Sequence, residues 1–430
     1  MTTQTTTRVA TDPRLDDAFL QDFAVLSEIG RTPAGGVERQ AATAEDGQSR
    51  RWLADWLTRR GFTVRYDRIG NQFGLVELVP GAPYVLVGSH MDSQPRGGRF
   101  DGAYGVLAAA HACERLREHY SVSGGAVYNL AVVNWFNEEG SRFKPSMQGS
   151  GVFTGKIALD DALATRDPAG ITVAEALSEL GMLGEEDVFA LTDPSSAQRQ
   201  VASYAEIHIE QGRELDKADL TMGIVPSTWA ANKYEIGVVG VQGHTGATAM
   251  EDRQDALYAA ARIVVALREI ADRYGDELHT SCGQLNVIPN SPVVVAREVH
   301  MHLDLRSSSD ELLERADQDL SRVFAEVEVT ADVKIEKRFA HRWKGHVYPS
   351  AGVALAEDVL ADLGLAHLKV RTRAGHDSTN MKDHVPTVML FIPSVDGVSH
   401  AEHEYTTDED MVTGVNVLTE VVARMAEGAI

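Results

Sequence analysis

The chain has 430 residues, which is longer than a single hydrophobic core ordinarily serves, so two domains are expected. With 63 acidic and 40 basic residues its formal charge is −23, which argues against nucleic acid or an anionic membrane as a partner. The composition, 43% hydrophobic and 24% charged, is that of a soluble globular protein, and no apolar run approaches the roughly 20 residues of a membrane span.

The chain begins with the polar segment MTTQTTTRVATDPRL, which lacks the apolar centre of a secretory signal peptide. The two cysteines, Cys113 and Cys282, lie far apart and neither belongs to a CxxC pair, so a disulfide scaffold is not expected. Both features favour a reducing compartment, and we expect the protein to be cytoplasmic.

In the first half of the chain, helical and strand-like segments alternate. Helices are predicted at 21–29, 49–60 and 101–120. Short, almost continuously apolar runs at 83–90, 126–136 and 203–209 predict strands. Strands of this kind alternating with helices are typical of a mostly parallel sheet buried on both faces, so an α/β fold is expected.

Between about residues 228 and 340 the pattern changes. Strands are predicted at 233–241, 283–289, 298–306 and 333–339, and helices at 253–274 and 309–326. Their order, βαββαβ, is that of a ferredoxin-like unit and is complete in itself. A helix at 353–363 and a strand at 387–393 then resume the α/β pattern. We therefore predict a discontinuous domain of residues 1–227 and 341–430, with residues 228–340 inserted into it.

Residues of metal-ligand type gather at the ends of the predicted strands. They are His90 and Asp92 in GSHMDS, Asp101 in RFDGAYG, Glu138 and Glu139 in NEEG, His208 and Glu210 in EIHIEQG, and His400 and His403 in GVSHAEHE. One histidine at a strand end is more often structural, and a lone glutamate pair is more often solvated surface. Their recurrence at corresponding positions favours a metal site, because open α/β sheets assemble their sites at the carboxyl ends of strands.

Three histidines and two carboxylates suit zinc first, then manganese, cobalt or nickel. Five ligands are too many for one tetrahedral ion that keeps an open position, so two ions about 3.5–4 Å apart and bridged by a carboxylate are expected. This explains the adjacent glutamates of NEEG. One would bind metal, while the other would take a proton from a metal-activated water and deliver it to the leaving group.

Taken together, GSHMDS, FDGAYGVLAA, NEEGSRF, HIEQG, GHTGATAM, GHDSTNM and GVSH resemble the dinuclear-metal amidohydrolases. That group includes N-carbamoyl-L-amino-acid hydrolases, β-ureidopropionase and allantoate amidohydrolase, within the clan of zinc aminoacylases and carboxypeptidases. The motifs run in order from about residue 20 to the C-terminus. The resemblance implies a metallopeptidase-like catalytic domain with an inserted ferredoxin-like lid that also forms a homodimer interface.

The resemblance assigns the metal ligands and the general base. His90, Asp101, Glu139, His208 and His400 would bind two divalent ions per subunit, with Asp101 bridging them, and His403 is the weaker alternative to His400. Glu138 would be the general base. Asp92 would accept a hydrogen bond from His90 and fix its tautomer.

The resemblance also implies substrate contacts. His244, in GHTG, would reach the neighbouring subunit's site and stabilise the oxyanion, unless it is only a loop or N-cap histidine. Arg306 would bind the substrate carboxylate, unless it is held in a salt bridge to Asp304. Gln211, Asn290 and His376 are further substrate-binding candidates.

Two positions depart from the family pattern. Where relatives carry an Asn thirteen residues before the lid arginine and a Gln entering the lid, this chain has Val293 and Ala231. We expect hydrolysis of a linear amide in an N-carbamoyl or N-acyl amino acid with a free carboxylate. The alternatives are an aminoacylase or dipeptidase acting on a non-ureido amide, and a non-catalytic dimeric relative. A serine hydrolase is not favoured, because no GxSxG elbow joins a strand to a helix.

Overall fold

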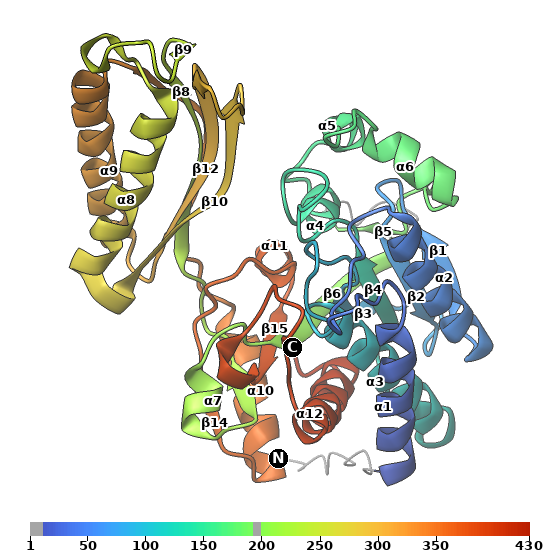
Figure 1. Cartoon of the computed structure of the whole chain (residues 1–430). Helices are drawn as coiled ribbons and strands as arrows, with labels where there is room; N and C mark the ends of the chain where they lie inside the picture. Colours follow the sequence, from blue (N-terminus) through green and yellow to red (C-terminus); the bar gives the residue numbers. More distant parts are fainter. Residues whose placement is uncertain (1–11, 192–198) are drawn as a thin grey trace. The chain divides into compact units, whose positions relative to one another are not determined.

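The computed structural model describes residues 12–191 and 199–430. It divides into a first unit, Met1–Pro226 with Tyr348–Ile430, and a second unit, Ser227–Val347, which is inserted into the first along the sequence (Figure 1). Among the described residues, no helix combines the length and apolarity needed to cross a membrane.

The first unit is built on a nine-stranded mixed sheet. Its strands are β1 (Thr63–Tyr66), β2 (Gln72–Val76), β3 (Tyr84–His90), β4 (Asn129–Trp135), β5 (Phe189–Ala190), β6 (Arg199–Ile209), β7 (Met222–Ile224), β14 (His367–Lys369) and β15 (Thr387–Ile392). The order is β1-β2-β4-β3-β6-β15-β7-β14, with β5 beside β6. The central strands β4, β3, β6 and β15 are mutually parallel, so the predicted mostly parallel sheet is confirmed.

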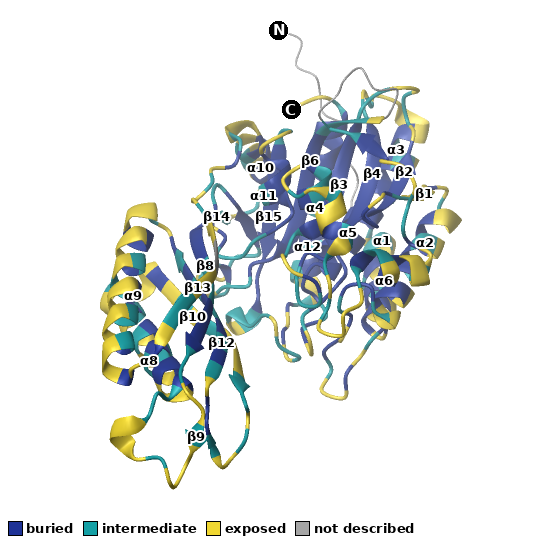
Figure 2. Cartoon of the chain, turned by 90° about the horizontal axis from the view of Figure 1, so that it is seen from above, coloured by how far each residue is buried: buried dark blue, intermediate teal, exposed yellow. Residues whose placement is uncertain are grey.

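Helices cover this sheet on both faces. They are α1 (Pro13–Ser27), α2 (Ala44–Arg59), α3 (Ala103–Ser123), α4 (Gln148–Phe153), α5 (Leu159–Ala164), α6 (Val173–Leu180), α7 (Glu214–Ala218), α10 (Ser350–Leu363), α11 (Ser378–Met381) and α12 (Asp408–Ala426), with a short 3-10 turn η3 (Val395–Gly397). One core contains α1, α2, α3, α10 and α12, and a second core on the opposite face includes residues of α4 and α11. Strands β3 and β4 and residues 203–209 of β6 are buried (Figure 2), as their mostly apolar sequences predict.

Local capping explains where the first helices begin. Asp12 accepts a hydrogen bond from the Arg14 backbone N–H and Pro13 occupies the first turn, so α1 begins eight residues before the predicted start at residue 21. Thr43 accepts from the Asp46 backbone N–H, so α2 begins at Ala44 and not at Ser49. The C-terminal helix α12 was not predicted at all.

The second unit contains β8 (Ala230–Val239), β9 (Gly243–His244), α8 (Ala256–Tyr274), β10 (Leu278–Ile288), β11 (Val294–Val295), β12 (Glu298–Ser307), α9 (Asp310–Ala331) and β13 (Lys334–Trp343), with 3-10 turns η1 (Met250–Asp252) and η2 (Gly275–Glu277). The main sheet has the order β10-β12-β8-β13, and every adjacent pair is antiparallel. Helices α8 and α9 lie side by side on one face of it (Figure 1). The order βαββαβ is thus the predicted one, although β13 runs past residue 340 to Trp343.

Successive side chains of strand β12 lie on opposite faces of the second unit's sheet. Its residues alternate between intermediate and buried, and the buried set, including Val299, Met301, Leu303 and Leu305, packs into the core with α8 and α9. Arg306 belongs to the other set. It pairs in register with Ala231 of β8 and His279 of β10, so these three residues form one row across the sheet.

Candidate metal centre

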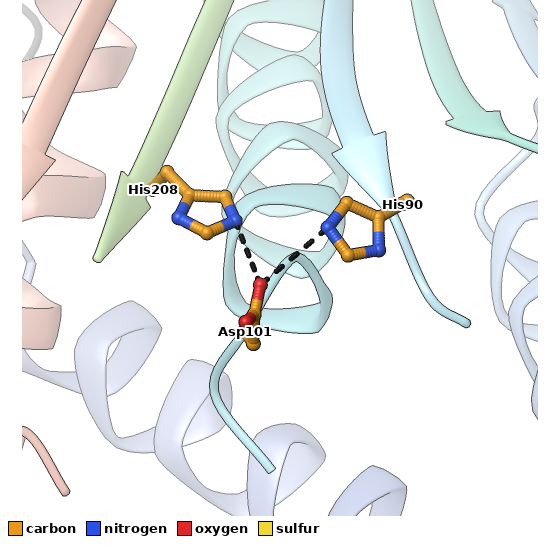
Figure 3. A group of neighbouring side chains, drawn as sticks. All are labelled: His90, Asp101 and His208. Atoms are coloured by element: carbon orange, nitrogen blue, oxygen red, sulfur yellow. Dashed lines mark ion pairs between the residues drawn. The ribbon is translucent and has the colours of Figure 1, made fainter. Parts of the chain in front are cut away.

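The first ligand group combines two strand ends with the start of a helix. His90 ends β3, and His208 lies near the end of β6, while Asp101 precedes α3. Both imidazole rings point towards the Asp101 carboxylate (Figure 3). The His90 Nε2 lies 3.5 Å and the His208 Nε2 3.1 Å from Asp101 Oδ1, and all three side chains are buried. Their ligand atoms all lie within 4.8 Å of one another, which is compatible with a shared metal ion.

A second ligand group uses the other oxygen of the same aspartate. His400 Nε2 lies 3.2 Å from Asp101 Oδ2 and 3.5 Å from Glu139 Oε2. These three residues again have ligand atoms within 4.8 Å of one another. Asp101 therefore belongs to both groups, as a carboxylate that bridges two ions must. His403 is exposed and belongs to neither group.

Main-chain carbonyls orient two of the imidazoles. His90 Nδ1 lies 2.9 Å from the Asp92 carbonyl oxygen, and His208 Nδ1 lies 2.9 Å from the Ile209 carbonyl oxygen. A carbonyl can only accept, so each Nδ1 carries a proton, and in the neutral ring the lone pair is on Nε2, the nitrogen nearer Asp101. This is the tautomer that a metal ligand needs.

Asp92 contacts His90 differently from the expected way. Its carboxylate Oδ1 lies 3.5 Å from His90 Nδ1, farther than the carbonyl oxygen of the same residue. The carboxylate instead accepts from the Glu138 backbone N–H at 3.2 Å and the Glu139 backbone N–H at 3.3 Å. Asp92 therefore positions the loop after β4, which carries both glutamates.

Local backbone geometry accounts for two further motif residues. Gly102 has a φ of +63°, and a Cβ built on it would lie 2.4 Å from the His90 ring, so only glycine allows this approach. Asn137 has a φ of +51°, which turns the chain sharply after β4. Its side-chain amide donates to the Phe143 carbonyl at 2.8 Å, and the Met147 N–H donates to the Glu138 carbonyl at 2.7 Å. These two hydrogen bonds hold the loop that carries Glu138 and Glu139.

Glu138 lies beside the ligands without belonging to either group. Its Oε2 is 3.7 Å from His90 Nε2, and the residue is 7% exposed. Burial raises the pKa of Glu138 well above its ordinary range, with the negative charges of Asp377 and Glu139 adding to this and His90 opposing it. A carboxylate of raised pKa is suited to accepting and releasing a proton near neutral pH.

The carboxylates of the site raise the pKa of the histidines beside them. Burial alone would lower the pKa of His90, but Glu138, Asp101 and Asp92 outweigh it and hold that pKa well above the usual value. Burial would likewise lower the pKa of His400, but the negative charges of Glu139 and Asp101 outweigh it and raise that pKa to about 9. Burial would raise the pKa of Asp101, yet the three histidines hold it well below its ordinary value. Imidazole protons thus balance the carboxylates, a task that divalent cations can take over.

Two other predicted residues lie close to the ligands. The Gln211 side-chain amide donates to Asp101 Oδ2 at 2.8 Å and to Ser399 Oγ at 3.1 Å. The His376 ring centroid lies 4.6 Å from that of His208, and its Nε2 lies 3.0 Å from Thr372 Oγ1. Glu210, by contrast, accepts from the backbone N–H groups of Glu214 and Leu215 at the start of α7, so its role is structural.

The remaining candidates lie in the second unit. His244, in β9, is exposed, and its Nδ1 accepts from the backbone N–H groups of Gly246 at 3.0 Å and Ala247 at 3.1 Å. Arg306 donates from Nη2 to Asp304 Oδ2 at 2.8 Å, the salt bridge weighed from the sequence. Asn290 is exposed in the segment between β10 and β11.

Sequence reasoning missed the groups that hold the ligands. Gln94 donates from its side chain to Glu139 Oε2 at 2.8 Å and from its backbone to Glu139 Oε1 at 3.1 Å. Glu404 accepts from the Asp101 and His400 backbone N–H groups. The spacing of His400 and Glu404 in HAEHE was the available signal for the second, because acidic residues beside metal ligands often position them.

The donor set fits two divalent ions. It offers three imidazole nitrogens and two carboxylates in two overlapping groups, a composition that suits borderline ions such as zinc. His90, Asp101 and His208 would hold one ion, and Asp101, Glu139 and His400 the other. Glu138 would stay free beside them.

Comparisons with known proteins identify the family of this chain. A family model described as Peptidase family M20/M25/M40 matches residues 86–424. A Mycolicibacterium smegmatis protein named only as a hydrolase is 64% identical over 427 residues, 99% of this chain and 97% of that protein. An N-carbamoyl-L-amino acid amidohydrolase of Geobacillus stearothermophilus is 34% identical over 416 residues, 95% of this chain and 98% of that protein.

A solved structure shares both the fold and the family. The amidase of the hydantoinase/carbamoylase family from Burkholderia vietnamiensis has a TM-score of 0.90 and 33% sequence identity, covering 99% of this chain and 100% of that one. The resemblance inferred from the motifs is thereby confirmed. The chain belongs to peptidase family M20/M25/M40 and, like these relatives, is a hydrolase.

Proposed function

We propose that the protein is a dinuclear-metal amidohydrolase that cleaves the linear amide of an N-carbamoyl amino acid. The observation that carries this proposal is the double use of Asp101, whose two carboxylate oxygens face separate groups of ligand-type residues. The relatives that share nearly the full length of the chain support the substrate class. When bound, two divalent ions would activate a water molecule and polarise the amide carbonyl.

Glu138 is the general base in this proposal. It lies next to His90 but outside both ligand groups, so its carboxylate is free to take the proton of the attacking water. The same carboxylate then delivers that proton to the nitrogen of the leaving amino acid as the C–N bond breaks. Asp92 holds the backbone of this residue and therefore sets where the base stands.

His244 is the proposed oxyanion donor, acting in the site of the neighbouring subunit of a homodimer. Because its Nδ1 accepts two backbone N–H groups, the neutral ring carries its proton on Nε2. A neutral imidazole with a fixed N–H is a suitable hydrogen-bond donor to a developing oxyanion. Arg306 is proposed to bind the substrate carboxylate, exchanging its contact with Asp304 for one with the substrate.

The decisive experiment compares substrates that differ only in the acyl group. The zinc- or manganese-loaded protein is assayed with N-carbamoyl, N-formyl and N-acetyl derivatives of one L-amino acid, and the released amino acid is measured. The highest kcat/KM is expected for the N-carbamoyl compound. Absence of hydrolysis of all three would contradict the proposal.

The metals are tested separately from the substrate. Exhaustive chelation should abolish hydrolysis, and a divalent ion should restore it. Elemental analysis should find up to two ions per chain in the wild type and one in His400→Ala, with His403→Ala as the matched control that keeps both. Full activity in metal-free protein would contradict the mechanism.

A non-ureido N-acyl amino acid is the second candidate substrate. Ala231 pairs in register with Arg306, so an apolar methyl group lies beside the proposed carboxylate-binding residue. Val293, at the other usually polar position, is 59% exposed. Each missing partner is expected to cost a ureido group about 1–3 kcal/mol, which favours a more apolar acyl group. A higher kcat/KM for the N-acetyl compound in the same series would select this alternative.

A further inference from the structure

Glu404 is a buried glutamate that joins two distant segments of the first unit. The residue is 4% exposed. Its Oε1 accepts from the backbone N–H groups of Phe100 at 3.2 Å and Asp101 at 3.1 Å, positions more than 300 residues away in sequence. Its Oε2 accepts from Ser399 Oγ at 2.8 Å and from the His400 backbone N–H at 3.3 Å. One carboxylate therefore holds both segments that flank the second ligand group.

The packing around Glu404 leaves its carboxylate little freedom. A Cβ built on Gly98 would lie 2.0 Å from Glu404 Oε1, so the segment before Asp101 closes tightly over this oxygen. Three backbone N–H groups and the Ser399 hydroxyl donate to the two oxygens. This is the environment of an anchored carboxylate, because an ionised carboxylate can only accept.

The backbone of His400 explains why an anchor is needed. His400 has a φ of +55°, a left-handed conformation that costs a non-glycine residue free energy and persists only when its surroundings enforce it. Its side chain is also half exposed, unlike the buried rings of His90 and His208. Of these three histidines, His400 thus depends most on contacts made by its backbone.

We propose that Glu404 is a positioning residue for the second metal ion, acting through Asp101 and His400 without touching substrate. This inference rests on the metal centre proposed above. By accepting from the Asp101 N–H, Glu404 positions the shared carboxylate. By accepting from Ser399 and the His400 N–H, it also positions the His400 imidazole. The ion held by Asp101, Glu139 and His400 should therefore depend on Glu404 more than the ion held by His90, Asp101 and His208.

The variant Glu404→Gln isolates this role. An amide of nearly the same size keeps one acceptor oxygen but turns an NH₂ group towards two of the four donors, so half of the anchor is lost. Loss of such a supporting contact typically weakens metal affinity about 10–100-fold. Glu404→Asp keeps the charge with a shorter reach and should lie between the wild type and Glu404→Gln.

Glu210→Gln is the matched control. Glu210 is also a buried glutamate that accepts two backbone N–H groups, and it lies two residues from His208, but its partners belong to α7. A general loss of structure should affect both glutamine variants alike. A positioning role should affect the second metal only in Glu404→Gln.

The experiment is a titration of the metal-free proteins with Co²⁺, followed by calorimetry and by the visible absorption of the bound ion, with circular dichroism to check folding. The wild type and Glu210→Gln should bind two ions per chain, and Glu404→Gln should bind the first nearly normally and the second about 10–100-fold more weakly. If Glu404→Gln does not fold, Glu404→Asp, which keeps the charge with a shorter reach, should weaken the second ion in the same direction by less.

Two results would overturn the inference. The first is unchanged affinity for both ions in Glu404→Gln, or in Glu404→Asp where that variant replaces it. The second is equal weakening in Glu404→Gln and Glu210→Gln. A wild type that binds no ion at all would instead remove the proposed metal centre, and this inference with it, so the two failures are distinguishable.

Discussion

The two units present their candidate residues in opposite ways. In the first unit, His90, Asp101 and His208 are buried and contact one another. In the second unit, His244 is exposed, and Arg306 contacts an acid only two residues away in its own strand. The first unit thus brings its ligand-type residues together from distant segments, whereas the contacts described for His244 and Arg306 are with residues close to them in sequence. We infer that the first unit holds the metal-binding groups and the base, while the second contributes side chains that act on the substrate, a division that mutants can test.

The largest effect is expected from Glu138→Gln. Removing the proposed base should lower kcat by about 10²–10⁴-fold while both metal ions remain bound. Glu139→Gln is the matched variant, since it should lose one ion. Elemental analysis and steady-state kinetics of the two proteins decide the assignment, which is reversed if Glu138→Gln is the one that loses metal.

His244→Ala should follow, with kcat lower by about 10²–10³-fold and metal content unchanged. Mixing it with Glu138→Gln tests whether the sites are shared between subunits. After random exchange, half of the dimers are hybrids with one complete site each, so about a quarter of the wild-type activity should return. Exchange without recovery, verified by mass labelling, would place His244 in its own subunit's site or outside catalysis.

Arg306→Ala is expected to have a smaller effect, confined to substrates that carry a carboxylate. Losing a charged hydrogen bond of about 1.5–3 kcal/mol should lower kcat/KM roughly 10–10²-fold. Asp304→Asn is the control, because it keeps the guanidinium and neutralises the acid that it contacts. If decarboxylated analogues react as fast as the acids with the wild type, Arg306 has no part in carboxylate binding.

The smallest effect concerns the pH dependence of metal binding. Because the surrounding carboxylates raise the pKa of His400 to about 9 and that of His90 well above its usual value, both rings hold protons near neutral pH in the absence of metal. Metal binding must displace these protons, so affinity should rise with pH up to about 9 and fall as the solution is acidified. Calorimetry in two buffers of different ionisation enthalpy measures the released protons, and a buffer-independent heat would contradict this.

Much of the framework follows from local patterns. The strands at 83–90 and 387–393 were predictable because they are continuously apolar and buried on both faces. Helix α12 was missed although its core residues Val415, Leu418 and Val422 recur at the i, i+3, i+7 spacing of a helix.

The site was predictable only in part. The residues brought together around Asp101 were predicted from strand ends and motifs, because parallel strands end at one edge of a sheet. The groups that hold these residues in place were not predicted. Glu404 bonds to a backbone more than 300 residues away, and His90 bonds to the main-chain carbonyl of Asp92, which any residue could supply. Contacts of this kind depend on tertiary placement and leave no residue pattern along the chain.

The residues of the two ligand groups lie far apart in the sequence, which would make folding depend on metal supply. The five ligand-type residues come from segments that meet only when the sheet of the first unit is formed: His90, Asp101, Glu139, His208 and His400. In the sequence, the second unit is inserted between His208 and His400. An unfolded chain therefore offers no comparable site, so the proposed ions would bind the native state selectively. At a free metal concentration 100 times Kd, this selective binding would stabilise the native state by about 2.7 kcal/mol per site, so the amount of folded protein would depend on metal availability.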